Sequence, residues 1–160
     1  MRRLTAGRRN SAIRKPEESR DWMADLEKLR QWLQTFPKWE GTLQVEYTEP
    51  GPGSTGLFPL GLEERNRRED VLGNLQVACR YRFSLYRRTG RQQEKNAQWL
   101  LEFQNWVQQQ SADGLTPHFG DVPQQERMQA EKGALKERTQ TGLYVVTLIA
   151  DFMKVYEVKE

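Results

Sequence analysis

Histidine, cysteine and long apolar runs are scarce in this 160-residue sequence. The single histidine, His118, leaves no histidine pair for a metal site, and its place beside Pro117 and Phe119 predicts a packing or surface role in a loop. The single cysteine, Cys79, cannot form an intramolecular disulfide, and it falls on the apolar phase of a predicted strand, where we expect a buried, inert thiol. No apolar run approaches the roughly 20 residues that cross a bilayer, so we expect no membrane association.

Signatures of catalysis are also missing. Gly51, Gly53 and Gly56 are interleaved with prolines, and no lysine follows them as a phosphate-binding loop requires. The carboxylates of residues 63–70 lie beside Arg65, Arg67 and Arg68, which indicates a self-neutralised, solvated surface. We therefore expect that the protein is not an enzyme, that it uses no cofactor, and that it has no catalytic, cofactor-binding or metal-binding residues.

Basic charge is concentrated at the start of the chain. Residues 1–20 hold seven of the 25 Lys and Arg residues and two of the 22 Asp and Glu residues, which leaves 18 basic against 20 acidic residues in 21–160. Because residues 1–20 have no aromatics and no periodicity, we expect a disordered basic arm that is dispensable for folding. Residues 21–160 are then expected to form a single domain.

Two segments have the periodicity of helices. The first apolar stripe predicts a helix that begins near Ser19 or Asp21 and ends before Pro37; its residues are Trp22, Leu26, Leu29 and Leu33. The second predicts a core-facing helix that stops before Gly114; its residues are Trp99, Leu100, Phe103, Trp106 and Val107.

The remaining segments favour strands and loops. Residues 75–87 and 142–156 alternate over a length that predicts two long central strands. Less regular patterns predict a half-buried strand within 42–49, a loop at 49–56, an edge strand after residue 57 with a turn at Gly73-Asn74, and a strand over 128–142 broken at Gly133. The element order predicts an α+β fold, with a small antiparallel β-sheet of about four strands and two α-helices packed on one face. The predicted core includes Trp22, Leu26, Leu29, Phe83, Trp99, Leu100, Phe103, Trp106 and Val145.

The strand of residues 75–87 carries arginines on its polar phase, which raises the alternative of a small, basic-armed nucleic-acid-binding module. Arg80 and Arg82 are followed by Arg87, Arg88 and Arg91. A sheet that binds single strands also needs aromatic rings on the same face for stacking. Strict alternation instead places Tyr81 and Phe83 on the opposite face and leaves only Tyr86 beside Arg80 and Arg82. Contact with another subunit, or simple solubility, explains these arginines better.

Four segments resemble tail terminator proteins, also called tail completion or minor capsid proteins, of long-tailed phages and prophages of Gram-positive bacteria. The segments are QWLQTFPKWEG, RYRFSLYRR, WLLEFQNWVQQQSADGLTPHFGD and GLYVVTLIADFMKVYE, and the likeness runs from about residue 23 to the end. The resemblance implies a small antiparallel sheet flanked by helices, a hexameric ring that caps the tail tube at the head–tail joint, and no cofactor or enzymatic activity. It also implies location at the head-proximal end of the tail in the virion, and in the host cytoplasm during assembly.

The implied partners are the protein itself in the ring, the phage tail tube protein, and a head-completion or connector protein, with no specific nucleic acid. Charged sheet residues suit contacts between ring subunits, and apolar residues on a Pro/Gly-rich loop, residues 49–61, suit docking. For the loop residues, the alternative is that they fold back onto the core. The interface candidates are Leu57, Phe58, Leu60, Arg80, Arg82 and Tyr86.

Overall fold

The protein is described from a computed structural model that covers residues 15–46, 53–89, 93–131, 134–138 and 142–158. The chain divides into two compact units, Met1–Thr35 and Phe36–Glu160. None of the helices of the described residues combines the length and the apolar character that crossing a membrane requires.

The described part of the first unit contains helix α1, Lys15–Leu33. It begins four residues before the predicted start at Ser19 and therefore includes the last part of the segment that was expected to be disordered; residues 1–14 lie outside the described residues. The helix ends before Pro37, as predicted. Leu29 and Leu33 of the predicted apolar stripe are buried.

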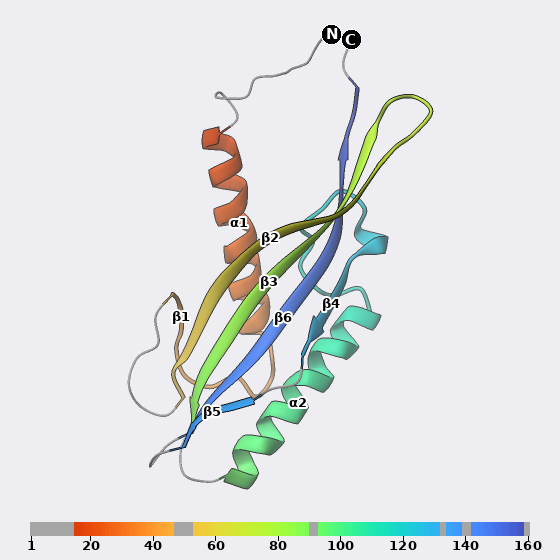
Figure 1. The fold of residues 1–160 in the computed structure, drawn as a ribbon. Coiled ribbons are helices and arrows are strands. Elements are labelled where there is room, and N and C mark those ends of the chain that lie inside the picture. The colour runs from red at the N-terminus through yellow and green to blue at the C-terminus, as the bar shows by residue number, and fades with distance from the viewer. Residues whose placement is uncertain (1–14, 47–52, 90–92, 132–133, 139–141, 159–160) are drawn as a thin grey trace. The chain divides into compact units, whose positions relative to one another are not determined.

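The second unit contains a six-stranded, mostly antiparallel sheet, which confirms the α+β class (Figure 1). The strand order is β1-β2-β3-β6-β4, and β5 pairs with β6. The prediction of about four strands was too low, and the sheet is not wholly antiparallel because β1, Leu43–Val45, runs parallel to the start of β2.

A long hairpin of β2, Thr55–Glu69, and β3, Leu75–Thr89, forms one half of the sheet. Its turn has the predicted position, and Gly73 adopts a positive φ of 87° that favours glycine. The Asp70 carboxylate accepts hydrogen bonds from the backbone N–H groups of Leu72 (2.9 Å) and Asn74 (2.8 Å), which holds the turn in place. Two irregularities in the β2 register, between Pro59 and Gly61 and between Glu64 and Asn66, interrupt the pairing.

The centre of the sheet is β6, Gly142–Tyr156, which pairs with β3 along its whole length. The predicted long central strands are thus confirmed. On its other side β6 pairs with two short strands in succession, β5, Ala134–Arg138, and β4, Arg127–Ala130. These two strands replace the single broken strand predicted over residues 128–142. A 3-10 turn, Pro123–Gln125, precedes β4.

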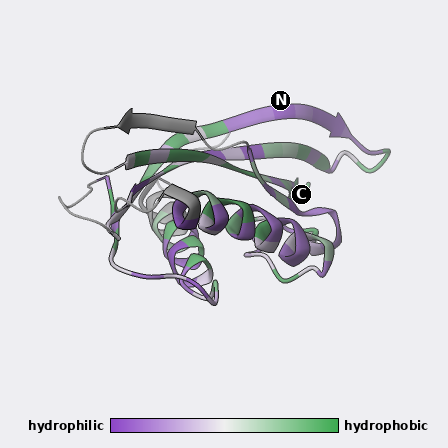
Figure 2. Ribbon diagram, turned by 90° about the horizontal axis from the view of Figure 1, so that it is seen from below, coloured by the Kyte–Doolittle hydropathy of each residue, from purple (hydrophilic) through white to green (hydrophobic). Residues whose placement is uncertain are grey.

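Helix α2, Gln93–Ala112, lies along one face of this sheet (Figures 1 and 2). Its fully buried residues are Phe103 and Val107, whereas Leu101 on the opposite side is exposed, so the helix face was predicted correctly. Gln104 of the helix donates to the Glu131 carbonyl (2.7 Å) and Ser111 accepts from the Met128 N–H (3.0 Å), which fixes α2 beside β4.

The core on the helix-covered side of the sheet is rich in aromatic rings. Tyr81, Phe119 and Phe152 contact one another, with centroids 4.8 to 5.9 Å apart. Of the predicted core residues, Leu29, Phe83 and Phe103 are buried. Five are only half-buried, and the side chain of Trp22 lies outside the described residues; the half-buried residues are Leu26, Trp99, Leu100, Trp106 and Val145.

Candidate functional site

Arg80, one of the predicted interface residues, is held by a carboxylate of its own sheet. Cross-strand pairing puts Arg80 opposite Asp151, and the guanidinium makes two hydrogen bonds to that carboxylate, Nε to Oδ1 at 2.7 Å and Nη2 to Oδ2 at 3.0 Å. The bond to Asp151 raises the pKa of Arg80 further above its ordinary value. A bidentate pair of this kind fixes the side chain in the sheet, so Arg80 offers little free charge to a ligand.

Arg82 is also paired, although more loosely. Its Nε lies 3.4 Å from Oε2 of Glu63 on β2, and both side chains are well exposed to solvent. Beyond these pairs, Phe58 and Tyr86 meet edge to face on the same side of the sheet, with centroids 5.2 Å apart. Among the described residues, Arg80 and Arg82 therefore each have a carboxylate partner and add little unpaired positive charge of the kind that nucleic-acid backbones require.

The three predicted docking residues lie in strand β2 and not in a loop. Leu57 is fully buried and faces Leu85, so the prediction that it is an exposed loop tip was wrong. The reason is that the Pro/Gly-rich segment ends earlier than expected, and strand pairing begins at Thr55. Phe58 is half-buried, and only Leu60 is clearly exposed, where the register of β2 shifts.

Four of the exposed apolar side chains lie together at the hairpin turn. Val71 and Leu72 in the turn are exposed, and so are Tyr156 and Val158 at the end of the chain. Tyr156 pairs with the first residue of β3, and the Val158 N–H donates to the Asn74 side chain (3.0 Å), so the chain end lies beside the turn. We call Val71, Leu72, Tyr156 and Val158 the distal apolar patch.

A second site lies at the other end of β3, around Arg87. This residue continues the buried phase of the strand after Tyr81, Phe83 and Leu85, and it is itself buried, with 8% of its surface exposed. Its Nη1 donates to the backbone carbonyl of Glu40 (3.2 Å) and to the Thr55 hydroxyl (3.0 Å). Burial lowers the pKa of the guanidinium, while the charge of Glu40 opposes that shift.

Tryptophan rings surround this guanidinium. Its central carbon lies 4.1 Å from the centroid of the Trp99 ring and 5.9 Å from that of Trp39, which are cation–π distances. Trp99 is positioned by stacking on Phe103 (5.2 Å, 5° between planes) and by donating from Nε1 to the Lys38 carbonyl (3.0 Å). Helix α2, strand β3 and the segment after Phe36 thus meet at Arg87.

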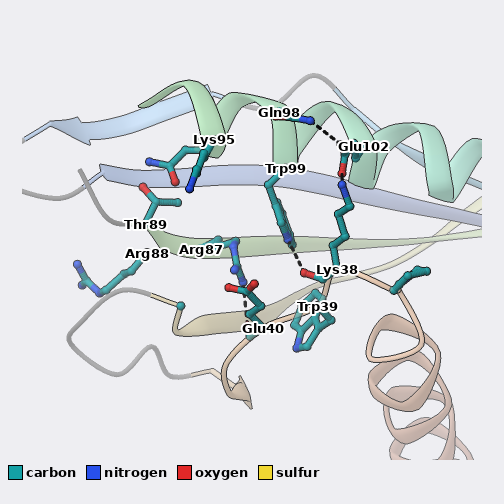
Figure 3. A pocket seen from close by; sticks show the side chains of 13 residues that line it. Lys38, Trp39, Glu40, Arg87, Arg88, Thr89, Lys95, Gln98, Trp99 and Glu102 are labelled. Carbon is teal, nitrogen blue, oxygen red and sulfur yellow. Dashed lines mark hydrogen bonds and ion pairs between the residues drawn. The ribbon is translucent and has the colours of Figure 1, made fainter. Parts of the chain in front are cut away.

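The space beside Arg87 is an open pocket of about 990 Å³ (Figure 3). Its wall from α2 includes Lys95 and Glu102, and Glu102 forms an ion pair with Lys38 (2.6 Å) that lowers the pKa of the Glu102 carboxyl. Arg88 also borders the pocket, but its side chain points away from Arg87 (Figure 3). The pocket can therefore offer a buried cation, aromatic faces and an exposed lysine to a ligand.

Other polar groups in the described part of the chain have structural roles. The buried Glu126 carboxylate accepts from the backbone N–H groups of Phe119 (2.8 Å) and Gly120 (3.3 Å), and His118 lies 3.7 Å from it. Burial raises the pKa of the Cys79 thiol, which keeps it protonated. No cluster of three or more potential metal ligands occurs among the residues described.

Sequence reasoning overlooked Arg87 as a site residue, although a signal was present. Arg87 was grouped with the cations that follow the strand. Extending the alternation that begins at Leu75 by one more step beyond Leu85 places Arg87 on the buried face. An arginine on the apolar phase of a strand is informative because charged residues are rarely buried without a partner.

No family model and no curated protein matches the sequence. The resemblance to phage tail terminators therefore enters the functional argument as a hypothesis.

Proposed function

We propose that this chain is a structural subunit of the head–tail joint of a long-tailed bacteriophage, where it assembles as a ring, hexameric as the resemblance implies, and caps the tail tube. The observation that carries the proposal is the distal apolar patch at the tip of the β2–β3 hairpin. Val71 and Leu72 are exposed on a turn whose backbone donates two hydrogen bonds to the Asp70 carboxylate, and Tyr156 and Val158 are exposed beside it. Such exposed patches mark protein–protein contacts.

Three further features support a contact role over a chemical one. Residues 60–69 of β2 are exposed throughout, so this arm of the sheet adds little to the core. Arg80 and Arg82 are paired within the sheet, which weakens the nucleic-acid alternative. The two ends of β3 also present different surfaces, one apolar and one charged, and the two contacting surfaces of a head-to-tail ring are likewise different from each other.

The test compares two variants of the full chain by electron microscopy, alone and with the tail tube protein of the same phage. Charges placed in the patch, Val71→Glu with Leu72→Glu, should abolish rings and tube capping. The control Leu115→Glu alters another exposed leucine and should leave both intact. Equal melting temperatures would confirm that the variants are folded.

A different result would contradict the proposal. The nucleic-acid-binding alternative would be favoured if the wild-type chain stays monomeric, does not bind tail tubes, and binds oligonucleotides with an affinity that falls steeply as the salt concentration rises. A monomer that caps tubes would retain the proposal, because the tube can serve as the template for the ring.

A further inference from the structure

Arg87 holds a buried positive charge for which none of the described residues provides an ion pair. None of the ion pairs formed by the described residues involves Arg87. Its two hydrogen bonds go to a backbone carbonyl and a hydroxyl, both of them neutral. Because burying a charge is costly unless it is paired, this site is suited to an anion supplied from outside.

The orientation of the guanidinium indicates what shape of anion fits. Trp99 covers one face of the group, and both hydrogen bonds come from Nη1. Within the described residues, Nε and Nη2 have no acceptor, so the edge between them is available in the plane of the group. Such an edge binds both oxygens of a planar carboxylate in a bidentate manner.

The charges around the pocket favour a singly charged ligand. Lys95 is exposed at the rim and points from α2 toward the strand (Figure 3). Lys38 is already paired with Glu102, while Glu40 is close enough to act on the charge of Arg87. Because Lys38 and Glu102 neutralise each other, the cations Arg87 and Lys95 are opposed only by Glu40 among the described residues that line the pocket. The single positive charge that remains matches one carboxylate better than a phosphate dianion.

We propose that the pocket of Arg87, Trp99 and Lys95 binds the carboxylate of a Glu or Asp side chain on an acidic segment of a partner protein. The choice of a peptide as the source rests on the proposed function. The pocket lies about 40 Å from the distal apolar patch, since residues 75 and 87 are twelve positions apart on a strand that rises about 3.3 Å per residue. A subunit therefore has a second, separate contact point whose specificity comes from charge.

The experiment is an NMR titration of the full chain that follows the Trp99 indole and the Arg87 Nε–H signals. The probes are acetyl-Gly-Glu-Gly-amide, its Gln counterpart, succinate and inorganic phosphate, each to about 20 mM, because a single contact of this kind has a Kd in the millimolar range. The Glu peptide should shift both signals and saturate, and the Gln peptide should not.

Variants then assign the binding to this pocket. Arg87→Met should weaken binding about tenfold or more, because a charged hydrogen-bonding group is lost, while Arg82→Met on the outer face should have no effect. Glu40→Gln removes a competing carboxylate and should tighten binding about threefold. Lys95→Gln, at an exposed position, should weaken it about twofold. The last two variants test the pocket even when Arg87→Met fails to fold, because they act in opposite directions.

Equal behaviour of the Glu and Gln peptides, or unchanged affinity in Glu40→Gln, would overturn the inference. Tighter binding of succinate or phosphate than of the Glu peptide would show that a protein side chain is not the source of the anion that the pocket binds. Ring formation and tube capping are scored separately through the distal apolar patch. A failed titration with intact rings would therefore reject only the pocket, and a successful titration without rings or capping would reject only the proposed function.

Discussion

Replacing Phe103 with alanine should remove a large part of the stability of the protein. The ring is fully buried in the middle of α2. It stacks on Trp99 at 5.2 Å and meets Phe36 edge to face at 5.5 Å and Trp106 at 6.1 Å. Because the rings around it cannot all collapse into the space, we expect a loss of about 3–5 kcal/mol in the free energy of unfolding.

Urea unfolding followed by tryptophan fluorescence and by far-UV circular dichroism would measure this loss. Coincident transitions with an unchanged m value would justify a two-state comparison. Leu101→Ala is the matched control, because Leu101 belongs to the same helix but is exposed, and it should change stability by less than about 0.5 kcal/mol. A loss below about 1 kcal/mol for Phe103→Ala would refute the assignment of the core-facing side of α2.

Three further substitutions test other parts of the fold. Asp151→Asn weakens the bidentate pair with the half-buried Arg80 and should lower stability by about 1–2 kcal/mol in the same unfolding assay. The backbone hydrogen bond from Asn74 is the main cause that lowers the pKa of Asp70 from 3.8. The stabilisation of the turn by the Asp70 carboxylate is therefore present above about pH 4 and is lost as the pH falls through the lowered pKa. NMR chemical shifts of the turn residues should follow this titration in the wild type, and Asp70→Ala should abolish the pH dependence. Gly41→Ala should destabilise the protein by more than about 1 kcal/mol, because residue 41 has a φ of 84° and an added Cβ would collide with the Gly53 carbonyl.

The parts of the fold that could be predicted are those in which burial follows a simple period. The strand from Leu75 alternates between core and outer face along nearly its whole length, and the stripe through Phe103 and Val107 lies on the buried side of its helix. In both cases one side of the element is covered by protein and the other is not, so the sequence pattern directly reflects the environment.

Strand β2 shows why the remainder could not be predicted. Its charged residues, from Glu63 to Glu69, are exposed on both faces, so they carry no alternation that would indicate a strand. Backbone pairing with β3 determines the structure there. Backbone hydrogen bonds are made by every residue type, so the order of the side chains in the sequence does not reveal them. Leu57 was misplaced for the related reason that the start of this pairing at Thr55 was not visible.

The Arg87 pocket could not be predicted because it depends on contacts between distant segments. Trp39, Thr55 and Trp99 come from three different parts of the chain, and only their packing makes the position of Arg87 special. Sequence alternation can place an arginine on the inner face of a strand, but it cannot say which rings will cover it.

The two register shifts in β2 have a consequence for how the sheet edge of one copy meets that of another. Apart from the three residues that pair with β1, no strand of the described residues covers the outer edge of β2. Proline at position 59, the two bulges and the charges that follow them interrupt that edge, so it is a poor template for another strand. The described edge of β2 therefore disfavours the joining of sheets from different copies into fibres.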